Sequence, residues 1–186
     1  MSASSSSSPA PRAAPAGSSS KRAAIIVALL VALGVAGYLG WQSVGRLDKA
    51  PAAAYTLLDG RQGNIEALRG KVVLVNFWAT SCTTCVAEMP HIVDTFRKYQ
   101  PRGYETLAVA MSYDPPAYVA RFAETRRLPF GVAIDNTGSI ARQFGDVQMT
   151  PTTFLLNKRG EIVKRYVGAP DFAELGRLIE KLLAET

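Results

Sequence analysis

From Tyr55 onward, the apolar positions of the chain alternate between short unbroken runs and longer segments with helical spacing. An unbroken apolar run predicts a strand covered on both faces of a sheet, whereas apolar residues three or four positions apart predict a helix with one buried face. The expected strands are 55–58, 72–78, 106–111, 131–134, 152–156 and 162–167, and the expected helices are 82–99, 115–126, 138–144 and 171–184. Strands that alternate with helices and end in a hairpin and a helix predict an α/β fold with a central mixed sheet flanked by helices.

The N-terminal part has a different pattern, because residues 23–41 contain no charged side chain. As a helix, this segment would be about 28 Å long, which matches the hydrocarbon thickness of a bilayer. Lys21 and Arg22 precede it, and Tyr38 and Trp41 lie at its other end. By the positive-inside rule, we expect a single transmembrane signal-anchor helix with its N-terminus in the cytoplasm and the folded domain outside.

The segments around this apolar stretch complete the expected organisation. Residues 1–22 consist mainly of Ser, Ala, Pro and Gly, which cannot form a core, so we expect a disordered cytoplasmic tail. We expect residues 42–54 to be a linker and residues 55–186 to be the folded domain. A cleaved signal peptide is the alternative to an anchor, since the Gly-Val-Ala sequence at 34–36 could serve as a cleavage site. Both alternatives export the domain.

The charge of the chain gives little support to nucleic-acid binding. The formal net charge is +6 over 186 residues, but the first 50 residues carry five Lys or Arg against one Asp. The remaining 136 residues carry 16 basic and 14 acidic side chains, a net charge of only +2. The excess positive charge therefore surrounds the apolar segment, and we expect no nucleic-acid partner.

Cys82 and Cys85 are the only cysteines, and they follow the apolar run that ends at Trp78. Two cysteines separated by two residues can form a disulfide when the chain between them turns tightly, as it does at the start of a helix. Unpaired N–H groups and the positive end of the helix dipole favour a thiolate there. The pattern therefore predicts a redox site. Export to an oxidising compartment agrees with this interpretation, because additional cysteines would be liable to form unwanted disulfides there.

Three separated motifs resemble one known family. They are residues 73–85 (Val-Leu-Val-Asn-Phe-Trp-Ala-Thr-Ser-Cys-Thr-Thr-Cys), Glu88-Met-Pro90, and residues 150–157, which begin with Thr-Pro-Thr-Thr-Phe. Together they resemble the thioredoxin fold and, more narrowly, the membrane-anchored TlpA/ResA group of bacterial thiol-disulfide oxidoreductases. The resemblance covers about residues 52–184 and implies a thioredoxin-like three-layer α/β/α domain after one N-terminal transmembrane helix.

The resemblance also implies roles for particular residues. Cys82 corresponds to the exposed nucleophile and Cys85 to the buried resolving cysteine. Glu88 corresponds to an acidic residue near the cysteines, and three positions after Cys85 it is a candidate proton acceptor. Pro151 corresponds to a cis-proline that faces the disulfide. Thr150 is then placed, with Trp78, where a substrate peptide would bind, and residues 114–129 correspond to an extra helical segment of the group.

Four positions depart from the family pattern. Ser81 stands where most members have a tryptophan before the first cysteine. Thr83 and Thr84 lie between the cysteines, where many relatives have a proline. Asn76 occupies the position of a buried aspartate in thioredoxin and cannot take up a proton, which makes Glu88 the better candidate for that role.

The resemblance implies a membrane-tethered periplasmic enzyme of the bacterial inner membrane. It would reduce disulfides of exported proteins, such as apocytochrome c or metal-site assembly factors, and would be recharged by a membrane thiol electron donor, with no cofactor beyond the Cys82–Cys85 disulfide. The alternatives are a copper-binding protein of thioredoxin fold, or a peroxiredoxin-like peroxidase. A zinc site is disfavoured because His91 is the only histidine. We expect the arginines at 126 and 127 to be solvated.

Overall fold

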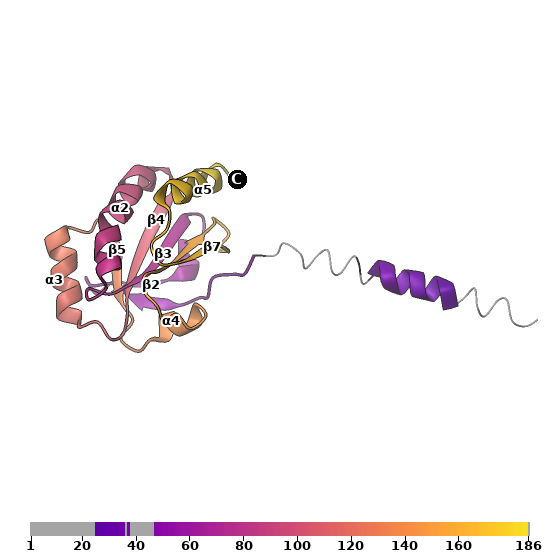
Figure 1. Cartoon of the computed structure of the whole chain (residues 1–186), viewed down its shortest axis with the longest axis horizontal. Helices are drawn as coiled ribbons and strands as arrows, with labels where there is room; N and C mark the ends of the chain where they lie inside the picture. The colour runs from indigo at the N-terminus through magenta and orange to yellow at the C-terminus, as the bar shows by residue number, and fades with distance from the viewer. Residues whose placement is uncertain (1–24, 36, 38–46, 186) are drawn as a thin grey trace, which may run out of the picture. The chain divides into compact units, whose positions relative to one another are not determined.

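The computed structural model describes residues 25–35, 37 and 47–185 (Figure 1). The expected tail and much of the expected anchor and linker therefore lie outside the described residues. Within the expected anchor, residues 25–35 and 37 are helical. Among the helices that the structure describes, none combines the length and the apolar character needed to cross a bilayer.

A five-stranded mixed sheet forms the centre of the domain. Its strand order is β5-β4-β3-β6-β7. β3 is parallel to β4 and β4 to β5, whereas β6 is antiparallel to both β3 and β7. The strand bounds are β3 Val72–Trp78, β4 Tyr104–Ala110, β5 Gly131–Ile134, β6 Thr152–Leu156 and β7 Ile162–Val167. The predicted mixed sheet is confirmed, and β4 begins two residues earlier than expected because Tyr104 is buried ahead of the polar Glu105.

β3 lies in the middle of this sheet because both of its faces are apolar. All seven of its residues are buried. Val73, Val75 and Phe77 contribute to one hydrophobic core, and Leu74 and Trp78 contribute to the other. This alternation follows from the two-residue period of a strand. A strand of this kind ends deep in the molecule, and the cysteine loop begins at that end.

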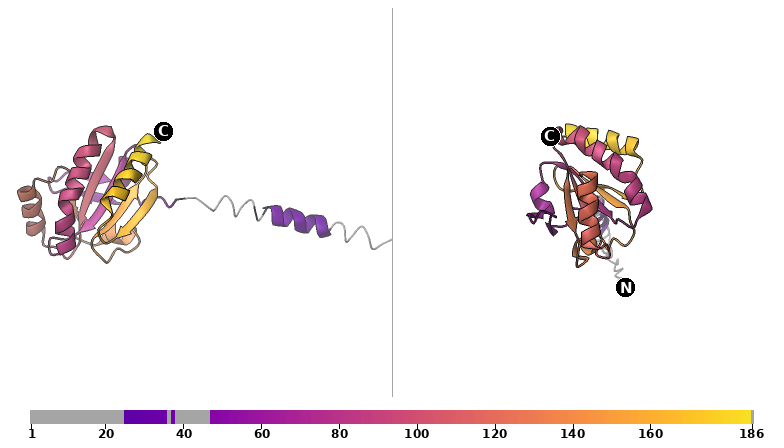
Figure 2. Two further views of the ribbon diagram at one scale, coloured as in Figure 1. Left: turned by 45° about the horizontal axis from the view of Figure 1, so that its top comes forward. Right: turned by 90° about the vertical axis from the view of Figure 1, so that its left-hand side faces the viewer.

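Helices cover both faces of the sheet and give the expected three layers. α2 Thr83–Tyr99, α3 Pro116–Arg126 and α5 Phe172–Ala184 contribute to the core on one face, and the short α4 Ser139–Gln143 contributes to the core on the other. α2 and α5 lie side by side (Figure 2). The carboxylate of Asp171 caps α5 by accepting hydrogen bonds from the N–H groups of Ala173 and Glu174, as the sequence predicts.

The folded unit begins before the expected boundary at Tyr55. A compact unit starts at Leu47, and Lys49 forms a β-bridge with Glu161 while Ala53 is fully buried. Residues 47–54, which the sequence places in the linker, are attached mainly by backbone hydrogen bonds and small side chains, which leave no apolar periodicity. Between this segment and β3, the chain forms β1 Ala54–Thr56, β2 Gln62–Asn64 and the short 3-10 helix η1 Ile65–Leu68. A second 3-10 helix, η2 Gln100–Arg102, follows α2.

Candidate active site

The two cysteines lie where β3 passes into α2. Cys82 is the N-cap of α2, and its sulfur accepts a hydrogen bond from the N–H of Cys85 at 3.2 Å. The cysteines form a disulfide with their Cα atoms 5.2 Å apart. Cys82 is half-buried and Cys85 is fully buried. A reaction partner can therefore approach the sulfur of Cys82, which lies at the positive end of the helix.

A buried polar group lies beside Cys85. The amide nitrogen of Asn76 donates to Glu88 Oε1 at 3.0 Å and to Thr153 Oγ1 at 2.9 Å. Glu88 Oε2 has no hydrogen-bond partner among the described residues, although Glu88 is only 3% exposed. These contacts bring together β3, β6 and α2, and they leave one carboxylate oxygen free to hold a proton.

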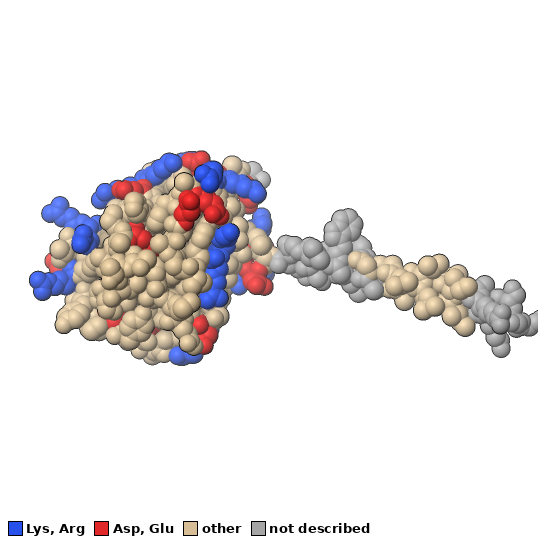
Figure 3. All heavy atoms as spheres, viewed as in Figure 1, with Lys and Arg blue, Asp and Glu red and all other residues tan. Residues whose placement is uncertain are grey.

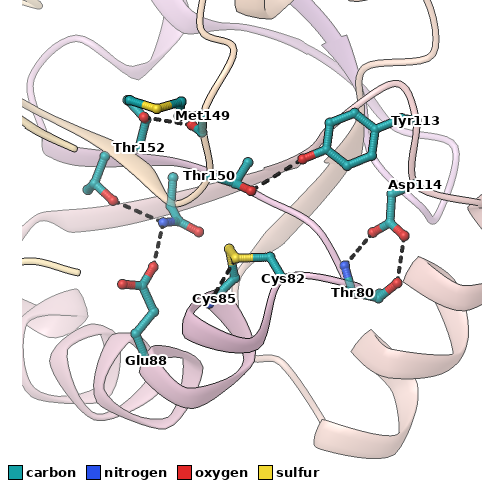
Figure 4. Close-up of a disulfide and its surroundings, with 11 residues drawn as sticks. Thr80, Cys82, Cys85, Glu88, Tyr113, Asp114, Met149, Thr150 and Thr152 are labelled. Atoms are coloured by element: carbon teal, nitrogen blue, oxygen red, sulfur yellow. Dashed lines mark hydrogen bonds between the residues drawn. A yellow bond between two sulfur atoms is a disulfide. The ribbon is translucent and has the colours of Figure 1, made fainter. Parts of the chain in front are cut away.

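Burial raises the pKa of Glu88 from its ordinary value of 4.5 to about 7, and the hydrogen bond from Asn76 only partly opposes this shift. Glu88 lies on α2 one turn after Cys85, and its carboxylate points toward the sheet (Figure 4). A carboxyl group with a pKa near neutrality can both accept and release a proton at physiological pH. The proton-accepting role of Glu88 stays a prediction, and Asn76, which the sequence set aside as unable to take a proton, is its hydrogen-bond donor.

The other side of the disulfide is open and carries the loop before β6. The peptide bond between Thr150 and Pro151 is cis. The side-chain oxygen of Thr150 lies 3.2 Å from the hydroxyl of Tyr113, which reaches it from the loop after β4. Met149, next to Thr150, is 63% exposed. Figure 4 shows the disulfide between Glu88 on one side and the pair of Tyr113 and Thr150 on the other.

A buried carboxylate fixes the loop that leads to Cys82. Asp114 is 2% exposed and accepts two hydrogen bonds from Thr80, one from the backbone N–H at 2.6 Å and one from the hydroxyl at 2.5 Å. Asp114 precedes α3, so these bonds join the α3 segment to the cysteine loop (Figure 4).

Trp78 does not present its ring to a substrate. Its side chain is fully buried, and its ring centroid lies 5.1 Å from that of Phe122 on α3. The strand that carries Trp78 ends inside the molecule, so the ring packs in the same hydrophobic core as Cys85. We therefore correct the expected contact between this side chain and a substrate.

His91 is exposed on α2, and its ring packs against that of Phe172 on α5 with centroids 5.0 Å apart. The described residues contain no group of three or more His, Cys, Asp or Glu side chains that could hold a metal ion.

The sequence did not identify Thr80, Tyr113, Asp114 or Thr153 as residues of this site. Their contacts join positions 34, 37 and 77 residues apart, so no local pattern contains both partners. One signal was available for Asp114 and Tyr113. Both follow β4, which is parallel to β3, and residues that follow neighbouring parallel strands meet at one edge of the sheet.

Known proteins share this arrangement. The chain matches the redoxin family over residues 47–179. It is 33% identical over 165 residues to the thiol-disulfide oxidoreductase ResA of Geobacillus thermodenitrificans, a match that covers 87% of this chain and 94% of that protein. Among solved structures, a protein of Neisseria meningitidis assigned as a thioredoxin has a TM-score of 0.70 and 39% identity, covering 75% of this chain and 93% of that one. A thiol:disulfide interchange protein of Chlorobium tepidum has a TM-score of 0.69 and 26% identity, covering 75% and 99%.

Proposed function

Because the chain belongs to the redoxin family and is a thiol-disulfide oxidoreductase similar to ResA proteins, we propose that its Cys82–Cys85 dithiol reduces disulfides of exported proteins. The observation that carries this proposal is the unequal burial of the two cysteines at the start of α2. An accessible sulfur can attack a partner, and a buried sulfur beside it can complete the exchange without meeting other thiols.

The reaction begins with the dithiol form. The Cys82 thiolate attacks one sulfur of the target disulfide, which forms a Cys82–target disulfide and releases the other target sulfur as a thiolate. The Cys85 thiol then loses its proton, and its sulfur attacks Cys82. This step forms the Cys82–Cys85 disulfide and releases the second target thiolate. Two electrons have passed to the target, and a membrane thiol electron donor would then reduce the disulfide again.

Glu88 would accept the proton of Cys85 in the second step. It lies one turn after Cys85 on α2, is buried, and has one carboxylate oxygen without a partner among the described residues. Because burial raises the pKa of Glu88 to about 7, the carboxylate can take the proton and later return it near neutral pH. Asn76 and Thr153 would hold the carboxylate in place.

The target polypeptide would bind along the loop that contains Thr150 and Pro151. Thr150 lies on the open side of the disulfide, and an extended peptide can pair with exposed backbone groups at such an edge. Tyr113 and Met149 are exposed next to this loop, so they are the side chains that a target would meet first. Apocytochrome c and metal-site assembly factors are candidate targets because they need reduced cysteines.

The N-terminal segment would tether the enzyme to the bacterial inner membrane, with residues 1–22 in the cytoplasm and the folded domain in the periplasm. Two observations support this. The described helical residues 25–35 are all apolar and exposed, and a helix that is apolar on every side is suited to lipid. The match to ResA covers 87% of the chain, more than the folded unit from Leu47 can supply, so it includes part of this segment.

The reduction potential of the Cys82–Cys85 couple tests the direction of electron flow. Full chain would be equilibrated with defined ratios of reduced and oxidised glutathione or dithiothreitol, and its thiols would be counted after alkylation. A reductase is expected to have a potential near that of thioredoxin, about -270 mV. A potential near that of a strong oxidant, about -120 mV, would show that the couple donates disulfides and would overturn the proposed direction.

A further inference from the structure

A groove runs along α3 beside the redox site. A hollow of about 210 Å³ lies between α2 and α3, and a second of about 360 Å³ lies along α3 toward Thr80. The two hollows adjoin, because Phe122 and Arg126 line both of them. We call them together the α3 groove; the lining residues that matter for its chemistry are Val86, Met89, Arg97, Arg121, Phe122 and Arg126.

The α3 groove begins at the disulfide. Val86 follows Cys85 directly in α2, and Thr80 lies two residues before Cys82. The ring of Phe122 packs on buried Trp78, which ends the strand leading to the cysteines. A polypeptide whose sulfur is bonded to Cys82 could therefore place its neighbouring residues in this groove.

Unpaired positive charge surrounds the groove. Arg97, Arg121 and Arg126 are exposed, and none of them forms a salt bridge with a carboxylate of the described chain. By contrast, Arg61, Arg69 and Arg159 each lie 2.8 to 2.9 Å from a carboxylate oxygen. In Figure 3, basic side chains project from the side of the domain where Figure 1 places α3.

Aromatic and apolar surface accompanies this charge. The guanidinium of Arg126 lies over the ring of Phe122, 5.6 Å from its centroid, and Tyr118 on the same helix is 64% exposed. Asp94 is the acidic side chain that lines the groove, against three arginines. Arginine binds carboxylates through two parallel hydrogen bonds, and arginine and aromatic side chains are enriched where binding energy concentrates in protein interfaces.

We propose that the α3 groove binds a stretch of the protein target in which acidic side chains flank the cysteine to be reduced. The carboxylates would pair with Arg121 and Arg126, and one apolar side chain would enter the hollow between α2 and α3. That hollow is smaller than the roughly 300 Å³ at which small-molecule pockets begin, so a single side chain fits it better than a whole ligand. The inference rests on the proposed function, and it gives Arg126 a binding role where the sequence predicted a solvated face.

Three disulfide-bonded peptides test this inference. They would share one sequence except that the residues flanking the cysteine are Glu in the first, Gln in the second and Lys in the third. The full chain, reduced beforehand, would be mixed with each peptide, and the second-order rate constant of the single turnover would be measured from the appearance of peptide thiol. We expect the Glu peptide to react about tenfold faster than the Gln peptide, the Lys peptide to react most slowly, and the differences to shrink at high salt.

Two double variants that remove the same amount of positive charge test whether the preference for the Glu peptide over the Gln peptide depends on the α3 groove. In the double variant Arg121→Gln with Arg126→Gln, the Glu-to-Gln preference is expected to fall to nearly one, and Arg121→Gln alone should lower it part of the way. The control Arg102→Gln with Arg177→Gln, whose residues do not line the α3 groove, should keep the preference. The inference would be overturned if the control variant lost this preference to the same extent, or if the groove variants kept it.

The outcomes also separate the two proposals. If all three peptides are reduced at the same rate, the chain is a reductase and the α3 groove does not select its target, so only this inference fails. If the Lys peptide reacts fastest, the proposed chemistry of the target is wrong. If none of the peptides is reduced, the proposed function fails, and the inference that rests on it fails as well.

Discussion

The two sulfurs of the disulfide lie in opposite surroundings. Cys85 is fully buried, and a buried group of hydrogen-bonded side chains from β3, β6 and α2 lies beside it. Cys82 is half-buried, and the loops on its side present Tyr113 and Met149 to solvent. Only two residues lie between the cysteines in the sequence, yet one sulfur faces the core and the other faces the surface.

This difference assigns one task to each side. In the proposed mechanism the open side would determine which partner reaches Cys82, through the loop at Thr150 and the α3 segment. The closed side would control the proton of Cys85 through Glu88, because burial raises the pKa of this carboxyl group to about 7. Changes on the closed side should therefore alter rates and pH dependence, and changes on the open side should alter partner binding and loop stability.

The largest effect is expected on the closed side, from Glu88→Gln. Glutamine has nearly the same shape but cannot accept a proton, so release of the target from the mixed disulfide should slow about a hundredfold near pH 7. The ionisation near pH 7 should also disappear from the pH profile of that step. Glu174→Gln is the control, because it removes an exposed carboxylate of α5 that does not line the α3 groove. Equal slowing in both variants would show that loss of a negative charge, and not loss of proton transfer, is responsible.

Glu88 should also make the stability of the oxidised protein depend on pH. The unfolded chain loses this proton near pH 4.5, whereas the folded chain keeps it until about pH 7. Between these values the unfolded state binds fewer protons, so the contribution of Glu88 to the free energy of unfolding falls as the pH rises. Urea denaturation of the natural chain and of Glu88→Gln at pH 5, 6, 7 and 8 measures the difference, which should grow in favour of the variant. A constant difference would contradict the burial of the group.

On the open side, Asp114→Ala should destabilise the domain by about 1–2 kcal/mol, because the N–H and hydroxyl of Thr80 both lose their hydrogen-bond acceptor. Asp135→Ala offers a matched control, since that buried carboxylate accepts hydrogen bonds from two backbone N–H groups of α4 and from none of the cysteine loop. Both variants should lose stability in thermal denaturation. Only Asp114→Ala should change the rate at which iodoacetamide alkylates reduced Cys82, and equal alkylation rates would contradict a role for Asp114 in holding the cysteine loop.

The smallest effect is expected from Tyr113→Phe. The hydroxyl of Tyr113 contacts Thr150 at the exposed surface, and loss of such a contact should change the free energy of unfolding by about 0.5 kcal/mol or less. A change in KM for a peptide substrate, with the pH profile unaltered, would agree with a position on the open side. A shift in the pH profile would instead show that Tyr113 affects proton transfer at Cys85, which would contradict its assignment to the open side.

The sequence predicted the fold well because the sheet consists of local apolar runs. β3 is identified by its own seven residues, and the hairpin of β6 and β7 by the turn residues between them. The start of the domain was placed too late. The residues from Leu47 to Ala53 are attached by backbone contacts and small side chains, which leave no pattern along the chain.

The site was predictable where chemistry follows from adjacent residues. Cys82, Cys85 and Glu88 lie within one short segment, and family resemblance placed Pro151 beside them. The pairing of Thr80 with Asp114 depends on how β3 and β4 lie together, which the apolar pattern does not specify. Trp78 shows the opposite error, since its position next to the cysteine loop suggested contact with substrate, whereas the strand turns its ring into the core.

Trapping of mixed disulfides tests most directly the claim that Cys82 attacks the target and Cys85 completes the exchange. The variants Cys85→Ala and Cys82→Ala, in the full chain and reduced beforehand, would each be incubated with a disulfide-bonded protein target and analysed by non-reducing electrophoresis and mass spectrometry. We expect Cys85→Ala to accumulate a covalent complex through Cys82, because the sulfur that would release it is missing. Accumulation with Cys82→Ala instead would contradict the assignment of both cysteines.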